Sequence, residues 1–419
     1  MKSLASVIDA FAFNFEPQPT MLTIEDLSLE GKVVFLRVDL NTPLEPSTGK
    51  LMELNRIQEA TVTIRDLSKS KVVIGSHQGR VGRDDYIPLN QHADALSQLL
   101  GKKIKFADDI FGPTALHEID SLKTGEVLLL DNLRFMAEEN MEYSPQDAAK
   151  TILVQKLYKH FDACVLDAFP TAHRAHPSIV GFSYLLPTCA GRLVSKELKA
   201  LNRIMSVSKA PFTTVLGGAK VSDRLEAIDT LITNNRADKV LLCGLIANVF
   251  LKAARKIDYD IGVDKEDRMV DRATFLMADY PDTFELPIDV AVLRSDERVE
   301  VPVSELRKGD KVFDIGSKTI DHYSRIIRSS GTIFMSGPPG LFEDPKFGQG
   351  TESLLRAMAS SFGTTIISGG HLSAALQRFG IKEWIDHVST AGGALVLFLG
   401  GKKLPLLEAL DNYERKFRK

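Results

Sequence analysis

The stretch Val215–Arg224, VLGGAKVSDR, decides the fold class of this chain of 419 residues. A short apolar run ends in Gly217-Gly218, and a polar segment starting at Lys220 follows it. Short buried runs that alternate with longer polar segments are typical of strand–helix units in parallel sheets covered by helices on both faces. The same rhythm recurs at Val33–Asn41, Val72–Arg80, Val127–Phe135, Cys164–His176, Leu241–Phe250, Ile333–Glu343 and Ile366–Leu376.

The chain is longer than one hydrophobic core usually holds, so we expect an α/β protein with two Rossmann-like domains, each a parallel sheet flanked by helices. The expected parts are 1–191, an interdomain helix 192–208 with an apolar stripe, and 209–403, with 404–419 as a C-terminal helix. Helical periodicity predicts further helices at Ala60–Ser68, Leu89–Leu100, Pro145–Lys159, Arg224–Asn234, Asp264–Met277, Thr351–Ser360 and His371–Phe379.

Composition excludes several classes of protein. A net charge of −3 argues against a nucleic-acid binder or a binder of anionic membranes, and no run approaches 18 apolar residues. Cys164, Cys189 and Cys243 lack metal-ligand spacing, which favours reduced core thiols and a cytoplasmic protein. The spacing within 4–11 predicts a short N-terminal helix that packs on the body or on a second subunit. Monomer and homodimer both stay open.

Basic side chains gather in the loops of the first half. A single arginine is usually an ordinary solvated surface residue, but five near comparable strand ends favour a site for a small, strongly anionic acid. Asp39 and Asn41 stand two apart, where they could hold a substrate hydroxyl. The basic set is Arg37, Arg56, Arg80, Arg134 and Arg174, accompanied by His77, His173 and His176.

Glycines take this place in the second half. Gly217-Gly218-Ala219-Lys220 follows a strand and opens a helix, as do Gly369-Gly370-His371 and Gly392-Gly393. Neither the Walker A spacing nor GxGxxG is present. Each glycine pair alone fits an ordinary tight turn; together they favour nucleotide phosphates approached by backbone amides at helix N-termini.

Nine motifs occur in the order typical of one family: RVDLNTP, SHQGR, LDNLRF, DAFPTAHRAH, VLGGAKVSDR, DIGSKTI, SGPPGLFE, GGHLSAAL and STAGGA. The chain thereby resembles the phosphoglycerate kinases from about Leu22 to Leu410, and GGHLS resembles the archaeal branch. The resemblance implies a glycolytic phosphotransferase that moves a phosphoryl group between ATP and the carboxylate of 3-phosphoglycerate, giving 1,3-bisphosphoglycerate and ADP. It implies that the first domain binds 3-phosphoglycerate, that the second binds the nucleotide with Mg²⁺, and that 404–419 returns to the first.

The resemblance also implies residue roles. Arg56, Lys220, Gly392 and Gly393 would act on the transferring phosphoryl group, and Arg37 and His173 would support the acid site. Substrate binding would fall to Asp39, Asn41, Arg56, His77, Arg80, Arg134 and Arg174. Nucleotide binding would fall to Lys220, Glu343, Gly369, Gly370, His371 and Leu372.

Three positions depart from the family pattern. His371 replaces an aspartate that usually contacts magnesium, Ser336 replaces an asparagine, and Arg224 replaces a lysine. The residues that hold the metal therefore stay open. A catalytically silent family member acting as a binding or scaffold protein is the alternative, which Lys220, Arg56 and the Gly392-Gly393 turn argue against.

Overall fold

The computed structural model describes residues 21–52, 54–207, 209–234, 236–257, 261, 263, 265–389 and 391–417. The N-terminal helix predicted within 4–11 lies outside them. The described chain forms two compact units, an N-terminal unit (21–199 with 403–417) and a C-terminal unit (200–402). Their boundary falls inside helix α9 (Arg192–Val207).

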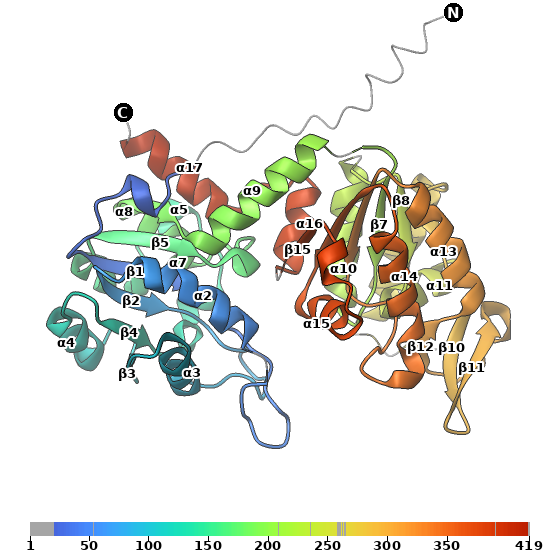
Figure 1. Ribbon diagram of the computed structural model, residues 1–419, viewed down its shortest axis with the longest axis horizontal. Coiled ribbons are helices and arrows are strands. Elements are labelled where there is room, and N and C mark those ends of the chain that lie inside the picture. Colours follow the sequence, from blue (N-terminus) through green and yellow to red (C-terminus); the bar gives the residue numbers. More distant parts are fainter. Residues whose placement is uncertain are drawn as a thin grey trace, which may run out of the picture. The chain divides into compact units, whose positions relative to one another are not determined.

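The N-terminal unit contains a six-stranded sheet in the order β3-β4-β2-β1-β5-β6, with every pairing parallel. Its central strands are buried on both faces, as the apolar run VLLL of β4 illustrates, and helices cover both faces (Figure 1). The strands are β1 (Val33–Val38), β2 (Lys71–Gly75), β3 (Lys105–Ala107), β4 (Val127–Leu130), β5 (Ala163–Asp167) and β6 (Thr188–Ala190).

Strand order places a topological switch between β1 and β5. From β1 the chain continues to β2 on one side, whereas from β5 it continues to β6 on the other. Open α/β sheets bind ligands at the carboxyl ends of the strands beside such a point. The helices of this unit are α2 (Asn55–Asp66), α3 (Asn90–Leu100), α4 (Pro113–Ser121), α5 (Pro145–Ala148), α6 (Ile152–Leu157), α7 (Pro177–Val180), α8 (Phe182–Leu185) and α17 (Pro405–Phe417).

The C-terminal helix α17 packs on α7 and α8 of the N-terminal unit. Its first turn is tied down where Leu406 N donates to Ala172 O at 3.1 Å, and the side chains of Leu406 and Leu410 are buried. Burial of this apolar face holds α17 against the N-terminal unit, although the chain shortly before α17, up to Lys402, belongs to the C-terminal unit.

The C-terminal unit has its own six-stranded parallel sheet, in the order β15-β14-β13-β7-β8-β9. Its switch lies between β7 and β13, the strands that precede Gly217 and Gly337. The strands are β7 (Phe212–Leu216), β8 (Lys239–Leu242), β9 (Phe284–Glu285), β13 (Thr332–Ser336), β14 (Thr364–Ser368) and β15 (His387–Ser389). The helices are α10 (Val221–Thr233), α11 (Gly244–Ala253), α12 (Glu266–Asp279), α13 (Ser317–Ser329), α14 (Gln349–Ala359), α15 (Gly370–Arg378) and α16 (Gly393–Leu399).

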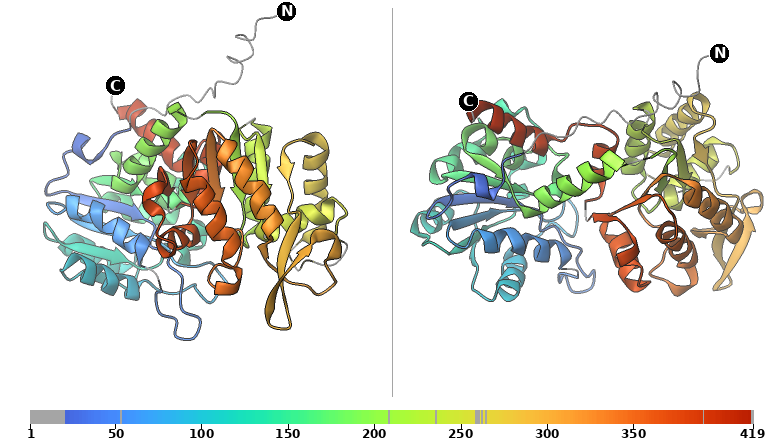
Figure 2. Two further views of the ribbon diagram at one scale, coloured as in Figure 1. Left: turned by 45° about the vertical axis from the view of Figure 1, so that its right-hand side comes forward. Right: turned by 45° about the horizontal axis from the view of Figure 1, so that its top comes forward.

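The two parallel sheets confirm the predicted fold class, but the C-terminal unit also contains an antiparallel sheet that the sequence did not predict. It has the order β11-β10-β12, formed by β10 (Asp289–Arg294), β11 (Glu297–Pro302) and β12 (Val312–Ile315). Figure 2 shows its long hairpin beside the main sheet of this unit. Ser295 and Asp296, both at positive φ, form the tight turn between β10 and β11.

The single helix predicted for Pro145–Lys159 is wrong, because the segment breaks into α5, α6 and a turn of 3₁₀ helix. Thr151 is extended (φ −61°, ψ 153°). The carboxylate of Glu138 accepts hydrogen bonds from the backbone amides of Ile152 and Leu153, at 3.0 and 3.1 Å. A carboxylate that caps these amides starts a new helix there. Among the described residues, no helix is long and apolar enough to cross a membrane.

Candidate active-site loops

In the N-terminal unit, the loops after β1, β2, β4 and β5 carry most of the predicted acid-binding side chains, and they meet at the carboxyl edge of the sheet. Asp39, in the loop after β1, accepts a hydrogen bond at 2.9 Å from Arg56 in the first turn of α2. Asn41 accepts one at 2.9 Å from the amide of Gly79, in the loop after β2. Asp39 therefore holds the side chain of Arg56, and Asn41 holds the loop after β2, so the two residues position different parts of the same basic surface.

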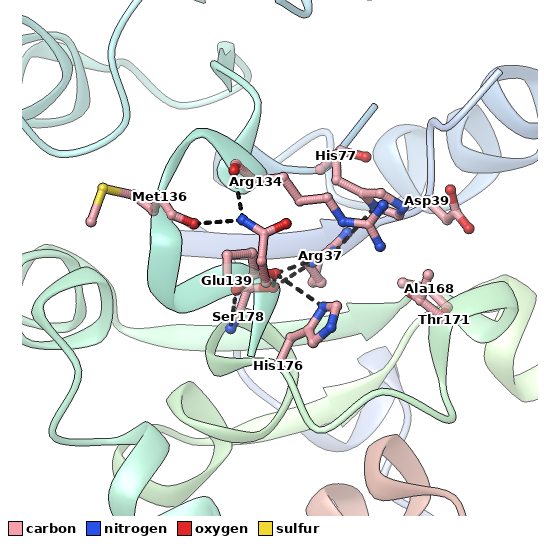
Figure 3. Close-up of polar contacts among 12 residues, drawn as sticks. Arg37, Asp39, His77, Arg134, Met136, Glu139, Ala168, Thr171, His176 and Ser178 are labelled. Atoms are coloured by element: carbon pink, nitrogen blue, oxygen red, sulfur yellow. Dashed lines mark hydrogen bonds and ion pairs between the residues drawn. The ribbon is translucent and has the colours of Figure 1, made fainter. Parts of the chain in front are cut away.

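Arg37, at the end of β1, lies in a fully buried polar cluster (Figure 3). Its Nε donates to Ser178 Oγ at 2.7 Å, and Nη2 lies 3.6 Å from Glu139 Oε1. Glu139 also accepts hydrogen bonds from the amide and hydroxyl of Ser178. With Nη1 donating to Val38 O, the guanidinium is largely satisfied by protein atoms.

Two histidines of this surface are held neutral. Burial lowers the pKa of His77 well below 6.5, and the charges of Arg134, Arg37 and Arg56 lower it further. Burial likewise lowers the pKa of His176 to about 3, helped by Arg37 and Arg134. A neutral imidazole carries one N–H donor, so both rings act as hydrogen-bonding groups at neutral pH.

The other arginines differ in exposure. Arg134, in the 3₁₀ turn Leu133–Phe135 after β4, donates to Gly79 O at 2.5 Å, and burial lowers its pKa to about 10. Arg80 is exposed, and its charge contributes to the lowered pKa of Arg134. Arg174 lies 3.5 Å from Glu142, and Arg174 and His173 both lower the pKa of His176. The charged residues and histidines of the predicted acid site thus lie close enough to affect one another's pKa, and Asn41 joins them through its hydrogen bond to the amide of Gly79.

Three polar residues that build this surface were missed at the sequence level. Gln78 and Asn132 are fully buried and exchange hydrogen bonds, and Gln78 Oε1 also accepts from Thr42 N at 2.8 Å. They lock together the loops after β1, β2 and β4. Gln78 and Asn132 could have been found from the sequence, because they lie inside the motifs SHQGR and LDNLRF. Glu139 could not, because it follows another acidic residue in a polar stretch that is typical of an exposed surface.

In the C-terminal unit, the loops after β7 and β13 touch through their glycines. Gly217 N donates to Ser336 O at 3.0 Å, and Gly218 N donates to Pro338 O at 2.9 Å. A side chain at Gly337, which has φ +81°, would come within 2.2 Å of Gly217 O. Lys220 immediately precedes α10, so the predicted strand–glycine–helix arrangement is present.

Two of the departures from the family pattern contact one another. Arg224 Nη1 donates to Ser336 Oγ at 2.9 Å, and Arg224 Nε donates to Gly217 O at 3.0 Å. The guanidinium therefore braces both loops at the switch point. Burial lowers its pKa, which the charge of Asp223 partly offsets.

The third departure lies at an exposed pair. His371, in the first turn of α15, places Nδ1 3.1 Å from Oε1 of Glu343. Among the described residues, no group of three His, Cys, Asp or Glu side chains could hold a metal ion. This lining fits a magnesium ion that arrives with nucleotide phosphates, since Mg²⁺ keeps waters and takes few protein ligands in such sites, while the helix N-terminus favours the phosphates rather than the metal.

The glycines before α15 and α16 differ from those at the switch point. Apart from the adjoining residues and the backbone of the same helix, no atom of the described residues lies within 4 Å of a Cβ built at Gly369, Gly370, Gly392 or Gly393. Of these four, Gly369 alone has a positive φ, +109°. Packing within the described chain therefore gives no reason for glycine at the other three.

A model of the phosphoglycerate kinase family matches residues 24–402. The chain belongs to the phosphoglycerate kinase family. A phosphoglycerate kinase of Methanocorpusculum labreanum is 40% identical over 403 residues, covering 94% of this chain and 98% of its own. That of Sulfolobus acidocaldarius is 41% identical over 401 residues, covering 93% and 95%. These archaeal relatives agree with the branch predicted from the sequence.

Solved phosphoglycerate kinases share the fold. The crystal structure of the enzyme from Pyrococcus horikoshii matches with a TM-score of 0.84 at 39% identity, covering 95% of this chain and all of that one. The structure from Coxiella burnetii matches with a TM-score of 0.71 at 31% identity, covering 94% and 99%. Family membership makes this chain a phosphotransferase, and nothing in these matches supports a scaffold protein.

Proposed function

We propose that the chain transfers a phosphoryl group reversibly between ATP and the carboxylate of 3-phosphoglycerate, giving 1,3-bisphosphoglycerate and ADP. The observation that carries this proposal is the set of basic loops at the carboxyl edge of the N-terminal sheet. They combine fixed cations with neutral histidines, which suits a small acid that bears a carboxylate and a phosphate.

In this proposal the acid lies against the N-terminal unit. Asp39 and Asn41 orient its hydroxyl group, and the exposed Arg80 and half-buried Arg174 neutralise its anionic ends. Arg37 and His173 support these residues from behind, as the buried hydrogen bonds of Arg37 favour. The full binding set is Asp39, Asn41, Arg56, His77, Arg80, Arg134 and Arg174.

The nucleotide lies against the C-terminal unit. Glu343 receives its ribose, and Gly369 to Leu372 line its phosphates at the start of α15. Open space above Gly370, Gly392 and Gly393 supports this placement, because a backbone without side chains lets phosphate oxygens reach the amides. Mg²⁺ enters with the nucleotide and neutralises phosphate charge.

The transfer itself needs positioning and charge neutralisation rather than a base, because the accepting carboxylate is already ionised at neutral pH. Lys220, Arg56 and the amides of Gly392 and Gly393 stabilise the moving phosphoryl group. Donor and acceptor must approach in line, so the two units close on their substrates during turnover. We extend the proposal to the cytoplasm, since Cys164, Cys189 and Cys243 are buried free thiols.

A coupled assay tests the proposal: ATP, Mg²⁺ and 3-phosphoglycerate are supplied, and ADP and acyl phosphate are measured. Lys220→Ala should lower kcat by at least ~100-fold, the usual loss when an electrostatic stabiliser is removed, and should spare 3-phosphoglycerate binding measured by calorimetry. No turnover at any Mg²⁺ concentration would overturn the proposed activity. Equal loss of binding and turnover would mean that Lys220 is misassigned.

A further inference from the structure

The buried ring of His77 has one hydrogen-bond partner among the described residues. Its Nδ1 lies 3.4 Å from Arg37 Nη2, and Nε2 makes no hydrogen bond to the described chain. A guanidinium carries only donors. Nδ1 must therefore accept, and the single proton of the neutral ring must sit on Nε2.

The position of Arg37 in turn depends on a carboxylate. Three buried or half-buried arginines, Arg37, Arg56 and Arg134, share this edge of the sheet with two carboxylates. The ion pairs are Arg37–Glu139 and Arg56–Asp39, whereas Arg134 donates to the carbonyl of Gly79. The charge of Asp39 also acts on Arg37. Without a negative charge at position 139, the buried Arg37 would be drawn to Asp39 and would compete with Arg56 for it.

We propose that Glu139 is a positioning residue of the acid-binding site: it holds Arg37 against Nδ1 of His77, so that His77 presents its Nε2–H to the anionic substrate, and it leaves Asp39 to Arg56. This inference rests on the proposed function for the identity of the substrate. The tautomer of His77 and the pairing of the arginines do not depend on it.

The ion-pair geometry explains why glutamate rather than glutamine would be needed. Glutamine could still accept from Ser178, and so could fill the same buried space, but it carries no charge to balance Arg37. Glu138 provides a matched control. It is adjacent in sequence, and its carboxylate caps α6 instead of contacting an arginine.

The first test is nitrogen NMR on the full chain labelled with ¹⁵N-histidine, with the His77 signals assigned by their loss in His77→Gln. The expected pattern has a protonated Nε2 and an unprotonated, hydrogen-bonded Nδ1. Glu139→Gln should shift the Nδ1 signal of His77 and leave that of buried His92 unchanged, since the ring of His92 bonds Gln78 instead. A proton on Nδ1 in the unmodified chain would overturn the inference, whether or not the chain turns over ATP.

The second test is kinetic. Glu139→Gln should raise KM for 3-phosphoglycerate roughly tenfold, as expected for one lost charge-assisted hydrogen bond, with KM for ATP unchanged. Glu138→Gln should leave both constants unchanged. If Glu139→Gln does not fold, Ser178→Ala removes contacts to both Arg37 and Glu139 and should raise the same KM. A normal KM for 3-phosphoglycerate and an unshifted His77 spectrum in a folded Glu139 or Ser178 variant would refute the positioning role.

Discussion

Asp167, at the end of β5, makes the stability of the N-terminal unit depend on pH. Its carboxylate accepts from Thr63 Oγ1 and, at 3.1 Å, from Val194 N in the first turn of α9. Burial nevertheless raises its pKa from 3.8 to about 7. Because the pKa is higher in the folded chain than in the unfolded chain, the stabilisation is complete below about pH 3.8 and is lost as the pH rises towards 7.

The magnitude follows from the two pKa values. A difference of about 3 pKa units amounts to about 4 kcal/mol over the whole titration, of which about 2.5 kcal/mol is lost between pH 5 and pH 8. Asp167→Asn cannot ionise. Its free energy of unfolding should therefore gain about 2.5 kcal/mol relative to the parent chain over that interval.

Urea unfolding followed by far-ultraviolet circular dichroism at several pH values measures this difference. The gap should appear as a relative shift of roughly 1 M in the urea midpoint between pH 5 and pH 8. Asp109→Asn is the control: backbone hydrogen bonds lower the pKa of Asp109, so it is ionised in both states over this range and its gap should stay constant. A constant gap for Asp167→Asn as well would refute the reasoning.

Three further predictions concern the C-terminal unit. Gly393→Ala should lower kcat and leave the free energy of unfolding within about 1 kcal/mol of the parent. Gly217→Ala should instead destabilise the fold, because its new Cβ would lie 2.4 Å from Pro338 O. Equal destabilisation by both variants would contradict a role for Gly393 in binding phosphate. Arg224→Lys should raise KM for ATP, because it removes the hydrogen bond to Ser336. The double variant Arg224→Lys with Ser336→Asn should recover part of this loss of ATP affinity, with a coupling free energy of about 1 kcal/mol. Strictly additive effects would show that the two positions do not interact. His371→Asp places a second carboxylate beside Glu343 and should lower the half-saturating Mg²⁺ concentration; an unchanged metal titration would make His371 irrelevant to the metal.

Most of the fold could be predicted because strand periodicity and loop composition are local signals. Each predicted strand–loop unit in the two main sheets is present, down to the glycines between β7 and α10. The antiparallel sheet β11-β10-β12 escaped because its outer strands β11 and β12 are partially exposed and lack long apolar runs, although the central strand β10 has the apolar run VAVL. The break between α5 and α6 escaped because its cause, Glu138, is a tertiary cap that lies 14 residues from Ile152.

The candidate acid site divides along the same line. Arginines and histidines at strand ends can be recognised in the sequence, since cationic side chains in such loops are typical of anion-binding sites. The partner that fixes Arg37 does not, because the burial of Glu139 arises from the packing of a 3₁₀ turn (Ala137–Asn140) against α7. A sequence can thus reveal which groups meet a ligand, while the groups that orient them depend on contacts between distant segments.

The glycine loops show that one residue type serves two purposes in a single sheet. Gly217 and Gly337 are required by protein packing, since a side chain on either would strike the other loop. A side chain on Gly370, Gly392 or Gly393 would meet open space in the described chain, and none of the three has a positive φ; Gly392 alone has an unusual ψ, −92°, so packing and φ give no reason for glycine at Gly370 and Gly393. Glycine at such positions lowers helix stability by up to about 1 kcal/mol relative to alanine. The presence of glycine at the start of both α15 and α16 is accounted for if phosphate oxygens occupy that space. An alanine there would then hinder phosphate binding and lower kcat without lowering the free energy of unfolding, whereas an alanine at Gly217 would lower the free energy of unfolding.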